Sequence, residues 1–514
     1  MKKIFIILTG ISLVFSTSCK KTLNKEPLNI ISDNQVWSDP VLATAYLDQV
    51  LAEMTFMFAN CDYDPTGANV VIHVWNIHDQ FTRSDEGRHA YPWYPAYTTW
   101  GPGFLDKNGG FDENWMYPTV RSCNVFIKQM ETSTLEEGTK KYLAARARWA
   151  RAMCYFGMVE RYGGVPLITT AQAINEPIEQ LFVGRNKEEE VYDFIISEMD
   201  AIVSDLSLTE APGYPGKGAA MALKSRAALY AASIATWGTV QLNGLVGIKS
   251  ESANKFWSEC YEASDALIKL GPHQLYNKTP DNPINNYRQM FVDPNNSESI
   301  YAVQFKGVES VGLNNGWDMF TGPQGFVAWA GNAAAPYFET VQWFQKADGS
   351  PFVLDDATLA SKLWDPNELF AGLEPRFYAN IYTQNTPWKG SFCDNHTSLI
   401  LPDGSEINSG SYEGVAAQGI GNVDGGAITG FGCKKYLNEA SPLLPNNWNT
   451  TTPWMVFRVG EIYLNQAQAS MHLGKQGEAL TLVNAIRKRA GVAEYGAIDE
   501  EKVRHERNVE LMFE

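Results

Sequence analysis

Apolar residues recur at three- and four-residue spacing along much of the chain, and this period is typical of helices that bury one face. The strongest example is the stretch 138–162. Its apolar positions on one helix face are Leu143, Ala147, Ala150, Cys154 and Met158. The pattern predicts helices over these ranges: 39–59, 115–131, 138–162, 187–205, 218–236, 254–270, 458–473, 476–490 and 500–514. Two long stretches without a helical period lie between groups of predicted helices.

These stretches, about 60–114 and 271–457, interleave Gly, Pro, Asn and Asp with aromatic residues. We call them the first and the second excursion. They hold just under half of the chain and ten of its 15 tryptophans. Flexible linkers are not rich in tryptophan, so we expect both excursions to be folded.

The last helices carry the spacing of a tetratricopeptide helix–turn–helix. Small and apolar residues fall at relative positions 0, 7, 12, 16 and 19: Ala467, Gly474, Ala479, Val483 and Ile486. In this motif the glycine permits the turn, and the alanines let the two helices approach closely. One repeat cannot bury its core alone, so the other predicted helices must supply neighbours.

The N-terminus has the order of a secretory signal. Two lysines precede a short apolar run, and small residues follow it directly before Cys19. This arrangement resembles a bacterial lipoprotein signal, in which the Cys becomes the new N-terminus and carries the lipid. We therefore expect removal of 1–18, lipidation of Cys19, and a polar tether over 19–38. The alternative is an ordinary signal peptide with an incidental Cys.

Composition narrows the classes of protein. The 514 residues carry 41 Lys and Arg against 58 Asp and Glu, a net charge of −17, with a pI near 5.0. This acidic balance argues against a nucleic-acid partner, because phosphate binding needs a basic surface. Aromatic residues reach 12% and charged residues only 19%, which excludes disorder over most of the length. No apolar run reaches the roughly 18–20 residues of a membrane-spanning helix.

Six cysteines remain beside Cys19: Cys61, Cys123, Cys154, Cys260, Cys393 and Cys433. None forms a C-x-x-C pair. An exported protein can join some of them in disulfides, but the sequence does not assign the pairs. Buried free thiols are the simpler interpretation.

Sequence motifs of enzymes are missing. There is no H-E-x-x-H, and His73 and His78 are five residues apart, which does not place them on one helix face. The run 213–218 has the composition of a phosphate-binding loop without its spacing, so we expect it to cap the following helix. No nucleophile elbow or EF-hand loop occurs. The sequence therefore predicts no catalytic residue, no metal site and no cofactor.

Aromatic residues set among Gly, Pro and Asn are the candidate binding residues. Flat aromatic faces suit the apolar faces of sugar rings, and loops on a rigid scaffold often carry binding residues. The first excursion offers Trp93, Tyr94 and Trp100. The second offers further aromatics, together with polar partners for ring hydroxyls: Asn314, Asn315, Trp317, Asp318 and Trp329. The alternative for each aromatic is packing inside its excursion.

A longer motif resembles a known family. The segment 146–168 reads RARWARAMCYFGMVERYGGVPLI and is similar to the run RxxRAxxYFxLVxxYGGVPLI of the SusD/RagB family of nutrient-binding outer-membrane lipoproteins. Further stretches resemble motifs of that family in the same order: 28–43, 218–229, 458–469, 484–491 and 504–511. These blocks are spread over nearly the whole mature chain, so the resemblance is specific.

The resemblance implies an all-α, SusD-like fold, with four tetratricopeptide-like helix pairs as scaffold and the excursions packed on it as the ligand face. It divides the mature chain into an N-terminal helical region, 39–270, and a C-terminal region, 271–514. It also implies capture of oligosaccharides, less often peptides, without catalysis, and delivery to a SusC-like TonB-dependent transporter barrel in the outer membrane. Trp93, Tyr94 and Trp100 lie in the region where family members place sugar-stacking aromatics.

Two features depart from the family pattern. Lys20 and Lys21 follow Cys19, where surface-exported members usually carry acidic residues, although we still expect surface exposure. The family motif also continues beyond Glu514, so we expect the C-terminal region to be incomplete.

Charged residues inside the family motifs have a structural interpretation. We expect them to form salt bridges between helices: Arg146, Arg151, Glu461, Arg507 and Glu510. They are therefore not counted among the ligand-binding residues.

Two other kinds of function stay open at the level of sequence. An exported all-α glycoside hydrolase would need two carboxylates about 5–9.5 Å apart beside a cleft. A tetratricopeptide adaptor for protein partners would need a free concave face, which the long excursions disfavour.

Overall fold

The structure is a computed structural model. It describes residues 33–54, 84–89, 115–173, 175–305, 316–323, 326–327, 331–332, 334–396, 399–407, 429–440 and 450–514. The predicted signal segment 1–18 and Cys19 lie outside the described residues, as does most of the first excursion.

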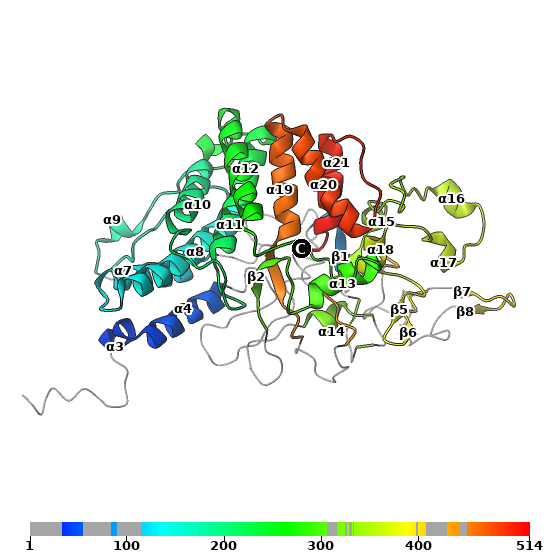
Figure 1. The fold of residues 1–514 in the computed structure, drawn as a ribbon, viewed down its shortest axis with the longest axis horizontal. Coiled ribbons are helices and arrows are strands. Elements are labelled where there is room, and N and C mark those ends of the chain that lie inside the picture. The colour runs from blue at the N-terminus through cyan, green and yellow to red at the C-terminus, as the bar shows by residue number, and fades with distance from the viewer. Residues whose placement is uncertain are drawn as a thin grey trace, which may run out of the picture.

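Long helices form the larger part of the described fold (Figure 1). Their bounds are α4 Pro40–Met54, α7 Tyr117–Thr132, α8 Glu137–Tyr162, α10 Glu188–Ile202, α11 Lys217–Trp237, α12 Ala253–Leu270, α19 Val459–His472, α20 Gln476–Ala490 and α21 Glu500–Leu511. Each helix predicted from the sequence is thus confirmed, and each begins within two residues of the predicted position. The mostly helical, all-α character of the fold is confirmed as well.

The ends of α8 explain the family motif that follows it. The Glu136 side chain accepts a hydrogen bond from the Thr139 N–H at 3.0 Å and caps the start of the helix. At its end Gly163 adopts φ +69°, and a Cβ there would lie 2.6 Å from the Leu245 carbonyl oxygen. A Cβ on Gly164 would lie 2.0 Å from the carbonyl oxygen of Asn186. Both glycines are therefore needed for the chain to pass between two other segments.

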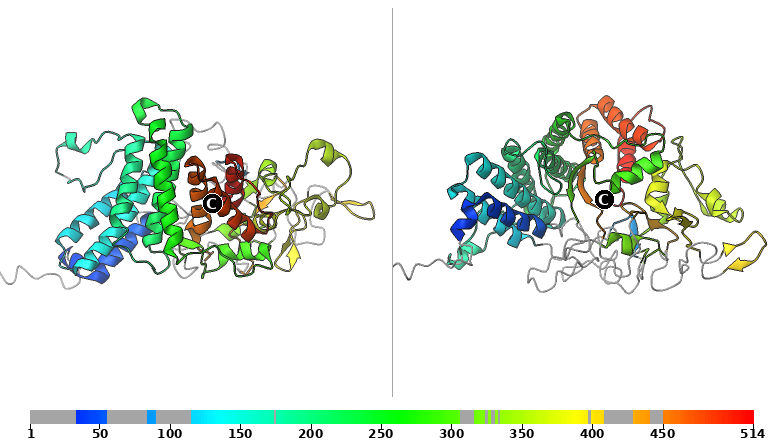
Figure 2. Two further views of the ribbon diagram at one scale, coloured as in Figure 1. Left: turned by 45° about the horizontal axis from the view of Figure 1, so that its top comes forward. Right: turned by 60° about the horizontal axis from the view of Figure 1, so that its bottom comes forward.

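The long helices pack in sequence order and form one arc. Neighbouring pairs along it are α7 and α8, α8 and α10, α10 and α11, α11 and α12, α12 and α19, and α19 and α20. Figure 1 and both views of Figure 2 show this succession, from the blue N-terminal helices to the red α21. Close approach in the middle of the arc depends on small residues. There the Ser225 and Ser264 hydroxyls lie 2.8 Å apart, and the Asn465 amide donates to Ser225 at 3.0 Å.

The α19–α20 pair confirms the tetratricopeptide-like spacing. Gly474 adopts φ +73° in the turn between the two helices. The apolar positions of the motif join residues of α21 in one buried cluster: Leu464, Ala467, Ala479, Val483, Ile486 and Val503. The third helix therefore supplies the neighbour that this pair needs.

The second excursion contains short elements that the helical period did not predict. Its helices are α13 Pro283–Val292, α14 Trp317–Thr321, α15 Phe338–Val341, α16 Asp356–Ala360, α17 Pro366–Leu369 and α18 Pro375–Asn380. Outside it lie the short helices α3 Asp33–Ser38, α9 Ile178–Leu181, η2 Leu242–Gly244 and η3 Ser250–Ser252.

The described strands form two-stranded antiparallel sheets. The most extended sheet joins β2 Ser299–Val303 to β10 Trp454–Arg458, with Val303 opposite Trp454. The others pair β1 Gly87–His89 with β3 Ala334–Pro336, β4 Ile381–Tyr382 with β9 Gly432–Cys433, β5 Pro387–Trp388 with β6 Ser391–Phe392, and β7 Leu399–Ile400 with β8 Glu406–Ile407. The β2–β10 ribbon connects the second excursion to the start of α19.

A buried network of ion pairs joins the second excursion to α20 and α21. We call it the C-terminal ionic cluster. Its cations are Arg376, Arg458, Arg487, Arg489 and Lys435, and its carboxylates are Glu298, Glu374, Glu506, Glu510 and Glu514. Five positive charges thus meet five negative ones. Arg458 lies 2.8 Å from Glu510, and Arg376 lies 2.6 Å from Glu506.

Further ion pairs join the helices of the arc. Arg151 of α8 lies 2.7 Å from Glu198 of α10, and Arg226 of α11 pairs with Glu461 of α19 at 2.5 Å. Arg146 of α8 faces Asp48 of α4 at 3.8 Å. The predicted helix–helix salt bridges are therefore confirmed for four of the five residues.

Arg507 is the exception to that prediction. Its guanidinium donates to the side-chain carbonyl oxygen of Asn465 at 2.7 Å. The partner on α19 is thus an amide and not a carboxylate, so the prediction of a salt bridge at this position was wrong.

The described cysteines are all free thiols in buried positions: Cys123, Cys154, Cys260, Cys393 and Cys433. This confirms the simpler of the two interpretations for those five. Within the part of the chain that the structure covers, no helix combines the length and apolar character needed to cross a bilayer.

Candidate ligand-binding site

Most of the predicted binding residues lie outside the described residues: Trp93, Tyr94, Trp100, Asn314, Asn315 and Trp329. Trp317 and Asp318, which open α14, are described. The structure therefore places two of the predicted ligand contacts, and the others stay predictions.

Trp317 is part of the packed interior. Its ring is 2% exposed, and its indole N–H donates to the backbone carbonyl of Lys435 at 2.9 Å. The ring also lies edge-on against Trp454, with centroids 5.4 Å apart. A ring covered in this way has no free face for a sugar, so we assign Trp317 a structural role in place of the predicted stacking role.

Asp318 connects the segments around α14. Its carboxylate accepts a hydrogen bond from the Asn438 N–H at 3.1 Å, and its own N–H donates to the Thr450 hydroxyl at 3.3 Å. Asp318 therefore links α14 to the segments at Asn438 and Thr450.

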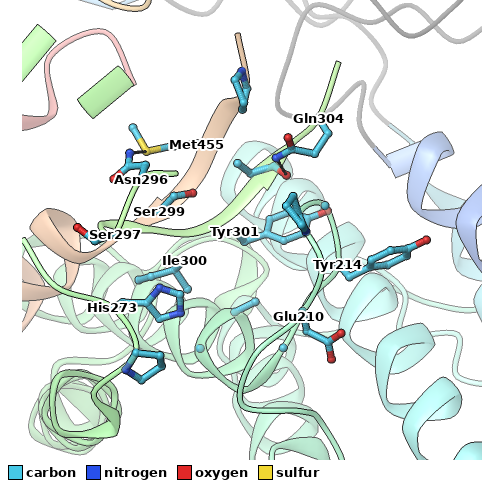
Figure 3. Close-up of a pocket in the computed structure, with 18 of the residues that line it drawn as sticks. Glu210, Tyr214, His273, Asn296, Ser297, Ser299, Ile300, Tyr301, Gln304 and Met455 are labelled. Carbon is cyan, nitrogen blue, oxygen red and sulfur yellow. Dashed lines mark hydrogen bonds between the residues drawn. The ribbon is translucent and has the colours of Figure 1, made fainter. Parts of the chain in front are cut away.

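A cavity of about 310 Å³ lies between the segment before α11 and the β2–β10 ribbon (Figure 3). We call it the β2–β10 trench. Its labelled lining residues are Glu210, Tyr214, His273, Asn296, Ser297, Ser299, Ile300, Tyr301, Gln304 and Met455. Aromatic rings and polar side chains both line it, which is the composition of a site for small polar molecules.

One residue that lines the trench, Glu210, has a carboxylate with unused hydrogen-bonding capacity. One oxygen of Glu210 accepts from the Tyr142 hydroxyl at 2.8 Å. The other oxygen is buried and has no hydrogen-bond partner among the described residues. A buried acceptor without a partner is costly, so a ligand hydroxyl that donates to it would gain affinity.

His273 adds a neutral polar group to the same trench. Burial lowers the pKa of its imidazole, which therefore stays uncharged at neutral pH. Gly218 makes room for it, because a Cβ there would lie 3.1 Å from the imidazole Nε2. The exposed side chain of Gln304 lines the cavity as a further amide.

Helix α8 holds the aromatic residues of the trench. Trp149 packs edge-on against Tyr301, with ring centroids 4.8 Å apart. The Arg146 guanidinium lies 4.0 Å from the centroid of the Tyr214 ring, and the Tyr214 hydroxyl donates to Asp48 at 3.1 Å. The scaffold thus orients the trench through buried contacts.

Two further cavities differ in chemistry. One of about 400 Å³ beside Arg226 is lined by ion pairs, including Arg226 with Glu461 and Arg161 with Glu160. The other, of about 690 Å³, lies around Trp388. The described residues contain no group of three or more His, Cys, Asp or Glu side chains placed to hold a metal ion.

Sequence reasoning missed the trench because its residues carry no motif. The run 213–218 was expected only to cap a helix, yet it forms one wall beside Gln304. The opposite wall comes from strand β2, more than 80 residues later in the chain. The only available signal was the cluster of Gly and Pro before α11.

Comparisons with known proteins agree with this architecture. The model of the "SusD family" matches residues 297–514, and the model described as "Starch-binding associating with outer membrane" matches residues 32–229. A SusD-like protein of Bacteroides ovatus is 26% identical over 432 residues, which cover 82% of this chain and 67% of the relative.

Solved structures share the fold. A SusD-like protein from Bacteroides fragilis has 27% sequence identity and a TM-score of 0.70, covering 95% of this chain and 87% of that one. A SusD-like carbohydrate-binding protein from the same species has 21% identity and a TM-score of 0.69, covering 93% of this chain and 85% of that one.

The arc of helix pairs, with irregular excursions packed beside it, defines the class of SusD-like helical proteins. The two matching family models together extend from residue 32 to residue 514, with a gap in the middle. The chain belongs to the SusD/RagB family.

Proposed function

We propose that the protein captures oligosaccharides at the outer membrane and binds them in and around the β2–β10 trench. The observation that carries this proposal is the unpartnered oxygen of Glu210 in a cavity lined by rings and amides. Sugars present both hydroxyl donors and apolar faces, which such a lining suits.

The position of the trench relative to the two segments matched by family models supports the proposal. One wall comes from the segment that matches the starch-binding model, and the other comes from the segment that matches the SusD model. The trench thus lies where both matched segments meet. The excursion residues Trp93, Tyr94, Trp100 and Trp329, with Asn314 and Asn315, are proposed as further contacts.

The proposal includes location and partner. Cys19 carries the lipid, 19–38 tethers the folded part, and the protein faces outward from the outer membrane. A captured glycan passes to a SusC-like TonB-dependent transporter barrel. The protein binds and does not cleave, so incubation with a bound oligosaccharide leaves the number of reducing ends unchanged.

Calorimetric titration with maltooligosaccharides and other neutral glycans tests ligand capture. Glu210→Ala and Gln304→Ala should each weaken binding several-fold, because a hydrogen bond contributes about 1 kcal/mol. Glu179→Ala on exposed α9 is the matched control and should bind as the parent does. Binding of oligopeptides without glycans would contradict the proposed ligand class.

Membrane fractionation tests the anchor. Cys19→Ala should move the protein out of the membrane fraction, since each buried CH₂ of an acyl chain contributes about 0.8 kcal/mol to anchoring. Unchanged fractionation of that variant would contradict lipidation at this position.

A further inference from the structure

The cavity around Trp388, which we call the Trp388 pocket, is more than twice as large as the trench, at about 690 Å³ against 310 Å³. Ile284 and Arg288 of α13 form one side, and the β5–β6 hairpin forms another. Phe370 and Phe377 give it an apolar floor. Its volume is within the range of about 300–1,000 Å³ that small-molecule sites occupy.

The charged residues of this pocket are mostly cations, whereas the chain as a whole is acidic. Among the described residues that line it, the cations are Arg288, Lys389 and Lys434, and the carboxylate is Glu439. Arg288 and Glu439 form an ion pair. Cations among these lining residues therefore outnumber carboxylates by three to one, in a protein whose net charge is −17.

Lys434 is the centre of that excess. The residue is 6% exposed, and its ammonium donates to the backbone carbonyl of Tyr378 at 3.3 Å. No carboxylate of the described chain lies within 4.0 Å of it. An ammonium has three donor hydrogens, so most of its hydrogen-bonding capacity stays unused. Burying such a charge without a counter-ion is costly.

Neighbouring groups add to the free-energy cost of burying the charged Lys434 ammonium. Burial and the nearby Arg288 lower the pKa of the Lys434 ammonium to about 8. Arg288 and Lys434 lie 5.7 Å and 5.8 Å from the centroid of the Trp388 ring, so both cations face the indole. Glu439, which pairs with Arg288, offsets only part of the lowering of the Lys434 pKa. An anion between the two cations would supply the missing negative charge.

Polar side chains complete the lining. Asn367, Asn385 and Ser391 line the pocket and are at least partly exposed. Amides and hydroxyls of this kind bind sugar hydroxyls. Together with the apolar floor, they favour a ring-shaped polar ligand over a simple inorganic ion.

We propose that the Trp388 pocket binds an anionic sugar residue, whose carboxylate or sulfate pairs with the Lys434 ammonium. The inference rests on the proposed glycan capture in taking a sugar as the ligand. It also goes beyond that proposal, because it adds a second binding site and names anionic sugars as its ligands. The trench offers a hydrogen-bond acceptor and a neutral imidazole, whereas this pocket offers a cation.

Titration calorimetry with matched ligands tests the inference. The probes are trigalacturonate, its methyl ester, and a sulfated galacto-oligosaccharide. The parent protein should bind at least one of the anionic probes about tenfold more tightly than the neutral ester, because the ion pair is absent from the ester. The preference between carboxylate and sulfate then identifies the source of the anion.

Variants assign the effect to Lys434. Lys434→Met keeps the length of the side chain and should lose about tenfold in affinity for the anionic probe, whereas Lys434→Arg should retain most of it. Lys362→Met removes a half-exposed lysine outside the pocket and is the matched control. Circular dichroism and thermal melting check that each variant is folded.

Two results would overturn the inference. One is equal affinity of the parent for trigalacturonate, the sulfated probe and the neutral ester. The other is unchanged anionic binding by folded Lys434→Met. If maltooligosaccharides still bind in either case, the trench proposal stands, whereas a parent that binds no sugar of any kind contradicts both proposals.

Discussion

Two buried groups of charged residues in this molecule are built in opposite ways. In the C-terminal ionic cluster every cation lies within 4.0 Å of a carboxylate, and five positive charges meet five negative ones. In the Trp388 pocket Lys434 is also buried, but its ammonium has a single carbonyl partner in the described chain.

This difference distinguishes buried charges that stabilise the fold from a buried charge that marks a binding site. Buried charges that satisfy one another hold segments in place, and removing one partner leaves the other uncompensated. A buried charge that the protein itself does not satisfy is a cost to folding, and a ligand that neutralises it recovers that cost on binding. We therefore interpret the cluster as structural and the pocket as functional.

Breaking the cluster should have the largest effect. Glu510→Gln leaves Arg376, Arg458 and Arg489 short of one negative charge in a buried position. We expect the free energy of unfolding to fall by about 3–5 kcal/mol, measured by urea denaturation. Glu137→Gln, in an exposed pair with Lys140, is the control and should leave the urea midpoint unchanged. Equal midpoints for the two variants would mean that the cluster contributes little.

Acid should act on the same cluster. Burial alone would raise the pKa of Glu510, but the surrounding arginines outweigh it and lower that pKa from 4.5 to about 2 in the folded state. A carboxylate with a lowered folded pKa stabilises the protein above its unfolded pKa, and this contribution is lost as the pH falls through the folded value. We expect roughly 3 kcal/mol to be lost between pH 4.5 and pH 2. In Glu510→Gln this pH dependence of the unfolding free energy should become shallower, and an unchanged slope would refute the assignment.

The helices of the scaffold could be predicted from the sequence, but the contacts that connect the scaffold to the second excursion could not. A period of 3.6 residues is local, so α8 and α20 were visible in their own residues. Strands β2 and β10 have five residues each and lie about 150 residues apart, so no local pattern reveals their pairing.

The burial of the candidate binding residues could not be predicted from local sequence patterns either. Trp317 lies among Asn, Gly and Asp, as an exposed ring would, yet its partners Lys435 and Trp454 come from distant segments and bury it. Lys434 looks like any lysine in the sequence. Its burial depends on α13, α18 and the β5–β6 hairpin, which only the folded chain brings together.

Alkaline pH should weaken binding of an anionic sugar in the Trp388 pocket. Because the pKa of Lys434 is about 8, its ammonium loses its proton above that value and the counter-charge disappears. We expect affinity to fall by up to about tenfold between about pH 6 and about pH 9.

The other groups that face Lys434 set the controls for this titration. Arg288 is paired with Glu439, burial raises the pKa of Cys393 to about 12, and burial also raises the pKa of Tyr378. Lys389 lines the same pocket, and burial lowers its pKa as well. The Lys434→Met variant therefore has to lose most of the pH dependence, and a profile parallel to that of the parent would assign the effect to another group.

Lys434→Met should have the smallest effect on stability, and its sign should be opposite to that of Glu510→Gln. Replacing an unneutralised buried ammonium by an apolar side chain of similar length removes a desolvation cost at neutral pH. We expect the unfolding free energy to rise by about 1 kcal/mol in the absence of ligand, measured by thermal and urea denaturation. A clear loss of stability would show that Lys434 is part of the framework.

A crystal structure of the protein grown with trigalacturonate or the sulfated probe, whichever binds more tightly, tests most directly whether the unneutralised charge marks a binding site. We expect an anionic oxygen of the sugar about 2.7–2.9 Å from the Lys434 Nζ, the length of a charge-assisted hydrogen bond. A sugar bound elsewhere, with no anion beside Lys434, would contradict the assignment of this pocket.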